Sequence, residues 1–170
     1  MINVLPYDPK VDILWSTPNP VEVVTRACSN TQKGIFAQET KSNAALIRFL
    51  YAAKHTSPLE HAVISFNITQ ISRACADQLR THRISSPTMS STHYQDHSQH
   101  PHRIPHVDIP TEHLETYRAS IVNSMNAYRV AIEQGMDPGD ARQILPMSVE
   151  VRYILTINAA SLAHMLHLRL

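Results

Sequence analysis

The stretch QLRTHRISSPTMSSTHY, residues 78–94, decides how the rest of the chain is interpreted. Basic and aromatic residues stand near its two ends, and four serines and two threonines fill its middle. The apolar spacing of Ile71, Cys75 and Leu79 predicts a helix that leads into this stretch. Pro87 cannot continue a helix, so we expect the serines to lie in a loop at a helix end.

The side chains of residues 78–94 suit a particular kind of ligand. Arginine and histidine donors beside hydroxyl groups can bind an anionic, hydrogen-bonding molecule, such as a nucleotide or the phosphate of a flavin. The same composition is also typical of a solvated polar loop that follows an amphipathic helix. These residues alone leave both interpretations open.

Composition limits the possible classes of protein. The chain has 170 residues, 43% hydrophobic and 17% charged, which predicts one globular domain, residues 1–170. A net charge of +1 argues against duplex nucleic acid as a partner. We expect no membrane span and no signal peptide, and therefore a cytoplasmic location. Cys28 and Cys75 fall in apolar helical patterns and are expected to be free thiols.

Helical and strand patterns are mixed without a repeated strand–helix–strand rhythm, so the sequence predicts an α+β fold. Up to residue 17 we expect a strand and a loop, and Asn19-Pro20 predicts a helix start. The other elements expected are a helix over residues 42–54 with Ala45, Ile47, Leu50 and Tyr51 on its buried face, a strand over 62–69, a long helix from a Thr111 cap to Gly135, a helical turn over 138–144, a strand over 149–157 and a last helix capped by Asn158.

Residues 95–110 are rich in polar and turn-forming residues, and we expect a loop there. Histidine is a common zinc ligand, so the four histidines of this segment raise the hypothesis of a metal site. Prolines interrupt the segment and no helix fixes the spacing of the histidines. We therefore expect a mobile loop and no metal. The histidines are His97, His100, His102 and His106.

Three polar patches occur in one order, and together they resemble a known family. They are His55-x-Ser57-x-x-Glu60-His61, then Gln78-x-x-Thr81-His82-Arg83 with Ser91 eight residues later, then Ala141-Arg142-x-x-Leu145-Pro146 followed by Asn158 and Arg169. This order and spacing resemble the flavin-dependent thymidylate synthases, the ThyX family, over residues 29–169.

The resemblance implies a fold and an activity. It implies a ThyX-like α+β fold with a central antiparallel or mixed sheet, assembled as a homotetramer with active sites between subunits. Enzymes of this family bind FAD, take a methylene group from methylenetetrahydrofolate, reduce it with NADPH and methylate C5 of dUMP to give dTMP. The chain would then be a methyltransferase.

The resemblance also assigns roles to individual residues. Arg169 matches the arginine that polarises the pyrimidine ring near N3, and Ser91 matches the serine beside the reacting carbon. The flavin-contacting positions are Ser29, His55, Ser57, Thr81, His82, Arg83, Asn158 and His164. The nucleotide-contacting positions are Gln78, Met89, Ser90, Ser91, His93, Arg142 and Arg169.

These residue types fit the chemistry. A guanidinium such as that of Arg169 near N3 and O4 stabilises the charge that develops as the uracil ring becomes electron-rich at C5. Arg142 can bind a phosphate through its fork of donors, or can form an ordinary surface ion pair. The helix N-terminus at Asn158 can bind a carbonyl or phosphate, or Asn158 can be a plain helix cap. The role of Glu60 stays open.

The sequence departs from the family pattern at four positions. The family has arginine where Thr81 and His93 stand, and Ala160 replaces the arginine of an Asn-x-Arg motif. Met89 replaces an acidic or amide residue. The chain also ends at Leu170, where the family continues with a further segment, so we expect the usual C-terminal extension to be absent.

Three hypotheses remain at this stage, because each lost charged donor removes roughly 1.5–3 kcal/mol of ligand binding. The first is an enzyme that still methylates dUMP. The second is a flavin-dependent methylase of another pyrimidine nucleotide, such as UMP or a deoxycytidine nucleotide. The third is a non-catalytic protein that binds flavin or nucleotide, alone or as the partner of an intact subunit.

Overall fold

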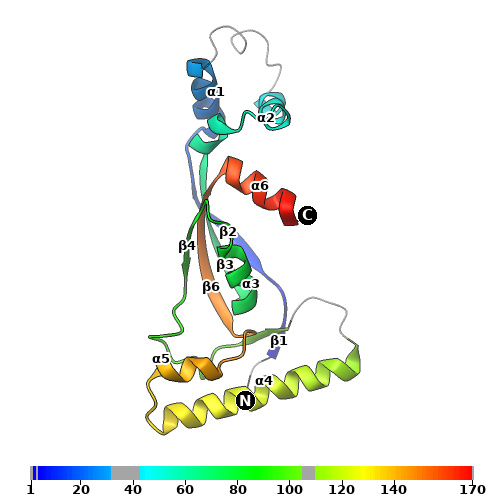
Figure 1. Ribbon diagram of the computed structural model, residues 1–170, viewed down its shortest axis with the longest axis vertical. Helices are drawn as coiled ribbons and strands as arrows, with labels where there is room; N and C mark the ends of the chain where they lie inside the picture. Colours follow the sequence, from blue (N-terminus) through cyan, green and yellow to red (C-terminus); the bar gives the residue numbers. More distant parts are fainter. Residues whose placement is uncertain (1, 3, 32–42, 105–109, 170) are drawn as a thin grey trace. The chain divides into compact units, whose positions relative to one another are not determined.

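The structure is a computed structural model that describes residues 2, 4–31, 43–104 and 110–169 (Figure 1). Helices and strands are mixed along the chain, which confirms the predicted α+β class. The elements are β1 (Val4–Pro6), β2 (Lys10–Ser16), α1 (Pro20–Thr31), α2 (Asn43–Ala52), the 3-10 helix η1 (Ser57–His61), β3 (Val63–Ser72), α3 (Arg73–Arg80), β4 (Ser86–Met89), β5 (His102–Ile104), α4 (Thr111–Glu133), α5 (Pro138–Ala141), the 3-10 helix η2 (Arg142–Ile144), β6 (Glu150–Asn158) and α6 (Ala159–Arg169).

The strands form two sheets. The larger sheet has the order β2-β3-β6-β4, and the smaller one pairs β1 with β5 in parallel, with Val4 opposite His102. Among the described residues, no helix is both long and apolar enough to span a membrane.

The chain divides into two compact units, which we describe separately. The first unit comprises Met1–Val11, Ile68–Thr81 and Thr88–Tyr153, and the second comprises Asp12–Asn67, His82–Pro87 and Ile154–Leu170.

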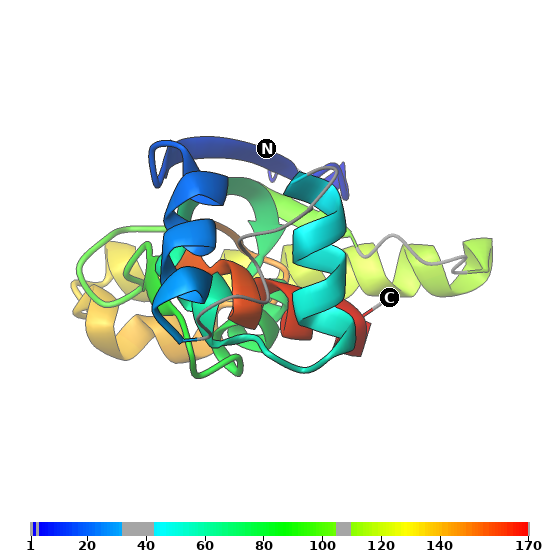
Figure 2. The same cartoon turned by 90° about the horizontal axis from the view of Figure 1, so that it is seen from above.

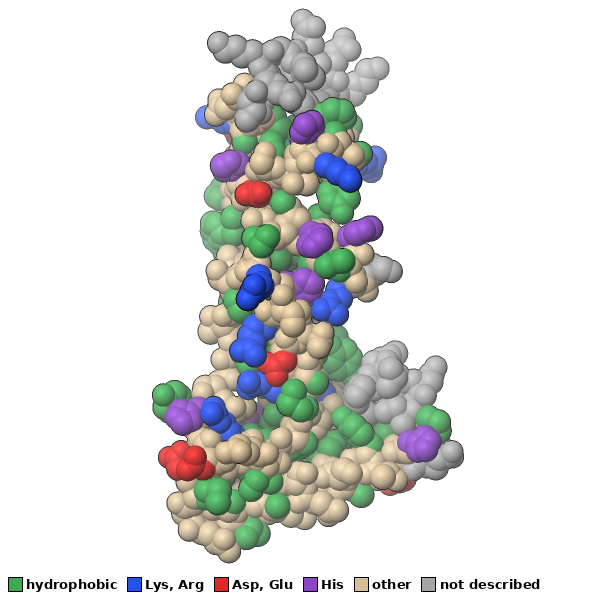
Figure 3. All heavy atoms as spheres, in the orientation of Figure 1, with side chains coloured by type: hydrophobic (Ala, Val, Ile, Leu, Met, Phe, Trp, Pro, Cys, Tyr) green, Lys and Arg blue, Asp and Glu red, His purple; other side chains and the backbone are tan. Residues whose placement is uncertain are grey.

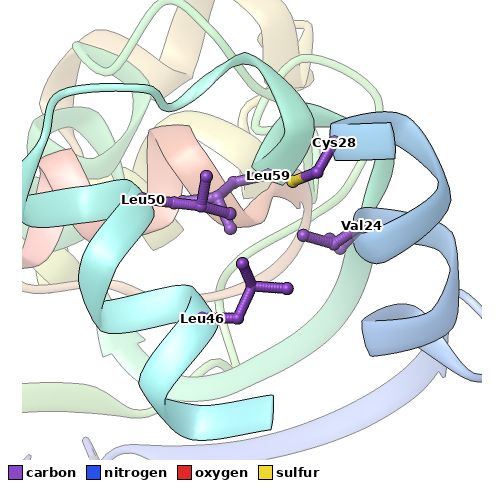
Figure 4. Packing of buried hydrophobic residues seen from close by; sticks show 6 residues of the cluster. Val24, Cys28, Leu46, Leu50 and Leu59 are labelled. Atoms are coloured by element: carbon purple, nitrogen blue, oxygen red, sulfur yellow. The ribbon is translucent and has the colours of Figure 1, made fainter. Parts of the chain in front are cut away.

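The second unit packs its helices around one apolar cluster. Helices α1 and α2 lie side by side in both views of the molecule (Figures 1 and 2). The cluster contains Val24 and Cys28 from α1, Leu46 and Leu50 from α2 and Leu59 from η1 (Figure 4). Each of these side chains is almost fully removed from water, and burial of that kind stabilises a protein by about 1.5–3 kcal/mol per large aliphatic side chain.

Helix α2 corrects one prediction about its buried face. Leu46 and Leu50 are buried, whereas Ile47 and Tyr51 are 38% and 43% exposed and Ala45 is exposed. Two apolar pairs with a spacing of four residues compete in this helix, and a sequence does not show which pair faces α1. The predicted stripe was wrong at three of its four positions, and only Leu50 was right.

The first unit has its core along the long helix α4. Ile121, Met125, Tyr128 and Ala131 pack with Ala141 of α5. The predicted end of α4 is confirmed, since Gly135 adopts a φ of +84° and donates its N–H to the Ile132 carbonyl. The predicted Thr111 cap was wrong, because the helix begins at Thr111 and Pro110 holds the cap position.

The strand before the 78–94 stretch is longer than predicted. β3 continues to Ser72, so Ile71 lies in the strand and does not begin the helix. The alternation was hard to follow because Gln70 has a φ of +61°, which shifts the buried face from Ile68 to Ile71. The hydroxyl of Ser72 then caps α3 by accepting from the Cys75 N–H at 3.2 Å.

Two segments predicted as loops contain short strands. Pro87 lies in β4, which is an edge strand of its sheet, where a missing N–H donor is tolerated. His102–Ile104 forms β5, and Arg103 anchors it by donating to the Glu150 carboxylate and, at 3.0 Å, to the Pro6 carbonyl. Both strands are too short for periodicity to reveal.

Several other predictions, in both halves of the chain, are confirmed. Buried and less buried residues alternate along β6, and Val151, Tyr153, Leu155 and Ile157 are its buried positions. α1 begins at Pro20 and residues 138–144 are helical, as expected. As expected, neither Cys28 nor Cys75 forms a disulfide in the described part of the chain.

Candidate active site

The first unit holds six of the predicted nucleotide positions. Two of them, Ser90 and Ser91, directly follow β4 and are held by hydrogen bonds. After β4, Ser90 donates its N–H to the Arg152 carbonyl at 3.0 Å, and its hydroxyl accepts from the Arg152 N–H at 3.1 Å. The Ser91 hydroxyl accepts from the N–H of His93 at 3.1 Å. The serines are therefore held against β6 and within their own turn, in defined positions.

His93 is seated against α5. A Cβ added to Gly139 would overlap the Nδ1 and Cε1 atoms of the His93 ring. The ring therefore occupies space that only a glycine leaves open. α5 continues directly into Arg142, so the turn of Ser91 and the helix that leads to Arg142 are in contact through this histidine.

Arg142 lines a cavity of about 370 Å³ in the first unit. Its guanidinium has no hydrogen-bond or ion-pair partner among the residues that the structure describes. Arg73 lines the same cavity, donating to Asp77 at 3.2 Å and to the Thr92 hydroxyl at 3.4 Å. Two guanidiniums and one carboxylate give the cavity a net positive charge, which suits a phosphate.

The other predicted positions of the first unit are on α3 and β4. Gln78 is exposed, and its carbonyl accepts from the Thr81 hydroxyl at 2.7 Å. Thr81 is the C-cap of α3. Met89 is the last residue of β4 and is half-buried.

The second unit joins two predicted positions that are 87 residues apart. Arg169, on the last turn of α6, donates through Nε to His82 Nε2 at 3.2 Å. The His82 carbonyl in turn accepts from the Ser85 hydroxyl at 2.6 Å. Because His82 Nε2 is the acceptor, the ring is neutral at this nitrogen and orients the guanidinium of Arg169.

Asn158 is confirmed as the cap of α6, since its Oδ1 accepts from the Ser161 N–H at 2.8 Å. Two residues later, Ala160 packs against the apolar cluster of Val24 and Leu46, so this departure from the family pattern is used for packing. The other predicted flavin positions of this unit are exposed. They are Ser29, His55, Ser57, Arg83 and His164.

On the face of the molecule drawn in Figure 3, acidic side chains are isolated, whereas Lys, Arg and His side chains recur across it. This distribution suits anionic ligands. No cluster of three or more potential metal ligands occurs in the described ranges, and His106 lies outside them. The expectation that the chain binds no metal stays a prediction.

Sequence reasoning missed Arg73 and two buried histidines. Arg73 is the first residue of α3. Nothing in the sequence around it indicates that it lies in the same cavity as Arg142. Burial lowers the pKa of His97 and lowers the pKa of His102 to about 4, so both rings are neutral at pH 7. They lie in the segment that was predicted to be a loop, where burial is not expected.

Comparison with known proteins agrees with the resemblance. The family described as Thymidylate synthase complementing protein matches residues 12–170. The Flavin-dependent thymidylate synthase of Geobacter sulfurreducens is 30% identical over 94% of this chain and 73% of its own length. That of Pyrococcus furiosus is 31% identical over 95% of this chain and 70% of its own length.

Solved structures show the same fold. The UMP/dUMP methylase PolB from Streptomyces cacaoi, bound with 5-Br dUMP, has a TM-score of 0.79 at 24% identity, over 97% of this chain and 79% of that one. Its structure bound with 5-Br UMP has a TM-score of 0.81 at 22% identity, over 98% and 78% of the two chains. With the family match and the relatives above, the chain belongs to the ThyX family of flavin-dependent thymidylate synthases.

Proposed function

We propose that this protein methylates C5 of dUMP to give dTMP, with FAD as the flavin and with methylenetetrahydrofolate and NADPH as co-substrates. The observation that carries the proposal is the positively charged cavity of Arg142 and Arg73 in a chain of this family. The name of the relatives favours dUMP over other pyrimidine substrates. A cytoplasmic location remains part of the proposal.

In this proposal the phosphate of dUMP binds Arg142. The guanidinium of Arg142 forms no ion pair with a carboxylate among the described residues. An incoming phosphate therefore does not have to displace one. Arg73 adds positive charge while its own position is fixed by Asp77. Ser90 and Ser91 contact the nucleotide from a backbone that β6 and His93 hold in place.

Arg169 acts on the pyrimidine ring. Its guanidinium stabilises negative charge at N3 and O4 when C5 becomes nucleophilic. His82 accepts from the Nε of Arg169 and so fixes the orientation of the guanidinium. His82 is thus a positioning residue for Arg169.

The exposed donors of the second unit fit FAD. Arg83 is exposed, and its guanidinium has no partner within the described part of the chain, so it can pair with a diphosphate. His55, Ser57 and His164 add further hydrogen-bonding groups. FAD, when bound and reduced by NADPH, would supply the reducing equivalents for the methyl transfer. Thr81 and Ala160 contribute no charge, so Arg83 and His82 carry more of the binding than in the family pattern.

The proposal includes a homotetramer with shared active sites. Ile13, Leu14 and Trp15 of β2 are each more than half exposed, which is unusual for large apolar residues next to one another. The same unit has an apolar cavity of about 760 Å³ that Ile13 lines. A second copy of the chain would cover this surface. Sedimentation velocity measures the assembly, and a monomer at micromolar concentration would contradict it.

The test of the proposed reaction is dTMP formation by the purified protein. The absorbance spectrum is recorded after FAD is added, then NADPH, and dTMP is measured after dUMP and methylenetetrahydrofolate are supplied. We expect a flavin band that NADPH bleaches, and dTMP production. Arg142→Ala should raise KM for dUMP about 10- to 100-fold. Arg118→Ala, at an exposed position of α4, is the matched control. Absence of both bound flavin and dTMP would overturn the proposal.

A further inference from the structure

His97 is a buried histidine in the segment that joins β4 to β5. Its side chain is 0% exposed. Its Nε2 lies 3.3 Å from the carbonyl oxygen of Ser91. A carbonyl can only accept, so Nε2 carries the proton in this contact. Nδ1 is buried and has no hydrogen-bond partner in the described residues, which fits the neutral ring with a single N–H.

Helix α4 fixes the position of His97. The backbone N–H of His97 donates to the hydroxyl of Tyr128 at 3.2 Å, and Tyr128 is fully buried in the core of the first unit. The following carbonyl, of Ser98, accepts from Nε and Nη2 of Arg129 at 3.1 and 2.7 Å. The segment around His97 is therefore attached to a rigid helix at two successive residues.

The charged groups around His97 agree with a neutral ring. Burial lowers the pKa of His97, and the nearby His100 and Arg73 lower it further, whereas the Ser91 carbonyl and Asp96 raise it. The ring of His100 lies 4.2 Å from that of His97 between centroids. A neutral ring with its N–H on Nε2 keeps the donor that Ser91 requires over the physiological pH range.

We propose that His97 is a positioning residue for nucleotide binding, because its Nε2–H fixes the backbone of Ser91, the serine that contacts the pyrimidine nucleotide. This inference rests on the proposed function. Ser91 lies between two other fixed points, since Ser90 is bound to β6 and the His93 N–H donates to the Ser91 hydroxyl. His97 supplies the third contact, at the carbonyl, and connects this turn to α4.

A matched pair of substitutions tests the role of the donor. In His97→Gln the side-chain amide nitrogen reaches the place of Nε2 and can donate to the Ser91 carbonyl. In His97→Asn the shorter side chain places its amide near Nδ1 and cannot reach. Both replacements are uncharged and both bury an amide, so their costs to folding are similar. A difference in dUMP affinity between the two variants therefore measures the effect of the hydrogen bond to the Ser91 carbonyl and not the loss of packing.

The expected result is a change confined to the nucleotide. His97→Asn should weaken dUMP binding about tenfold in the FAD-loaded protein, measured by titration calorimetry, and should raise KM for dUMP with KM for NADPH unchanged. His97→Gln should restore dUMP affinity to within about threefold of wild type. Hydrogen exchange at Ser91–His93 should be faster in His97→Asn than in His97→Gln.

His102→Asn serves as the control for a general loss of stability. His102 is also 0% exposed and lies in the same unit, but its Nδ1 is 3.3 Å from the Ser148 hydroxyl and not near Ser91. This variant should be less stable and should bind dUMP as wild type does. Equal dUMP affinity in wild type, His97→Asn and His97→Gln, or the same loss in His102→Asn, would overturn the inference. Wild-type protein that binds dUMP without forming dTMP overturns only the proposed reaction, and protein that does not bind dUMP overturns both.

Discussion

The predicted nucleotide residues and the predicted flavin residues are held very differently. In the first unit, Ser90, Ser91 and His93 are fixed by hydrogen bonds and by the close approach to Gly139. In the second unit most of the flavin positions are exposed, and among the described residues only the side chains of Ser29, His82 and Asn158 form hydrogen bonds there. The chain by itself thus holds these predicted nucleotide residues more firmly than the predicted flavin residues.

This contrast has a physical explanation. A small nucleotide needs a few donors in exact positions, because misplaced donors lose most of their binding energy. A large flavin can be bound by many weaker contacts, and in the proposed tetramer some of them come from neighbouring subunits. The departures from the family pattern follow the same division. His93 is built into the contact with Gly139, whereas Ala160 packs into the apolar core.

The largest effect is expected from removing the one predicted nucleotide residue of the second unit. Arg169→Ala should lower kcat for dTMP formation about 100-fold or more, because the proposed stabilisation of charge on the pyrimidine ring would be lost. Steady-state dTMP formation measures kcat, and the flavin absorbance checks that FAD stays bound. Leu168→Ala, which is 59% exposed on the same turn of α6 and does not line the apolar cavity, is the control. A kcat within about threefold of wild type would remove Arg169 from the reaction.

The contact between His93 and Gly139 can be broken from the glycine side. Gly139→Ala should destabilise the protein by about 1–3 kcal/mol and weaken dUMP binding, because the new methyl overlaps the His93 ring and lies 2.8 Å from the Asp137 carboxylate. Urea unfolding and calorimetry measure the two effects. In the double variant with His93→Ala, stability should largely return. If Gly139→Ala alone behaves like wild type, the ring is free to move and the site is less fixed than we infer.

The buried histidines of the first unit predict a stability that depends on pH. His102 has its folded pKa lowered to about 4, against about 6.5 in the unfolded chain. The unfolded state therefore binds more protons between these values, and stability is complete above about pH 6.5 and falls as the pH decreases towards 4. From pH 7 to pH 5 the loss from His102 is about 2 kcal/mol.

The pH prediction is measured by urea unfolding at the two pH values. The neutral variant His102→Asn should show a smaller loss, and what remains comes from His97, whose pKa is lowered in the same direction. The same loss in His102→Asn and in wild type would show that other groups account for the acid sensitivity.

The sequence predicted those parts of the fold in which one pattern dominates. β6 alternates over nine residues and α4 has a clear apolar stripe that ends at a glycine, so both were found. α2 has two equivalent apolar pairs, so its buried face depended on α1. β4 and β5 are too short to show a period, and their existence depends on strands distant in the sequence.

The candidate site divides in the same way. Resemblance of motifs supplied the predicted ligand-contacting residues, because the order of the three patches is specific. It could not supply Arg73, His97 or the fit of His93 to Gly139, since these depend on which side chains meet in space. Residues that position other side chains of a site are therefore the ones that a single sequence does not reveal.

The smallest effect should come from the exposed flavin positions, and it sharpens the contrast between the units. His164→Ala should lower FAD affinity only about two- to fivefold, because an exposed side chain contributes about 0.5–1 kcal/mol. Fluorescence titration of FAD measures the affinity. In wild type, dilution that dissociates the proposed tetramer should weaken FAD binding more than this substitution does. The dUMP contacts proposed for the first unit should be retained on dilution. A loss above 50-fold in His164→Ala at high concentration would mean that one chain organises its flavin site as tightly as its nucleotide site, and the contrast would no longer hold.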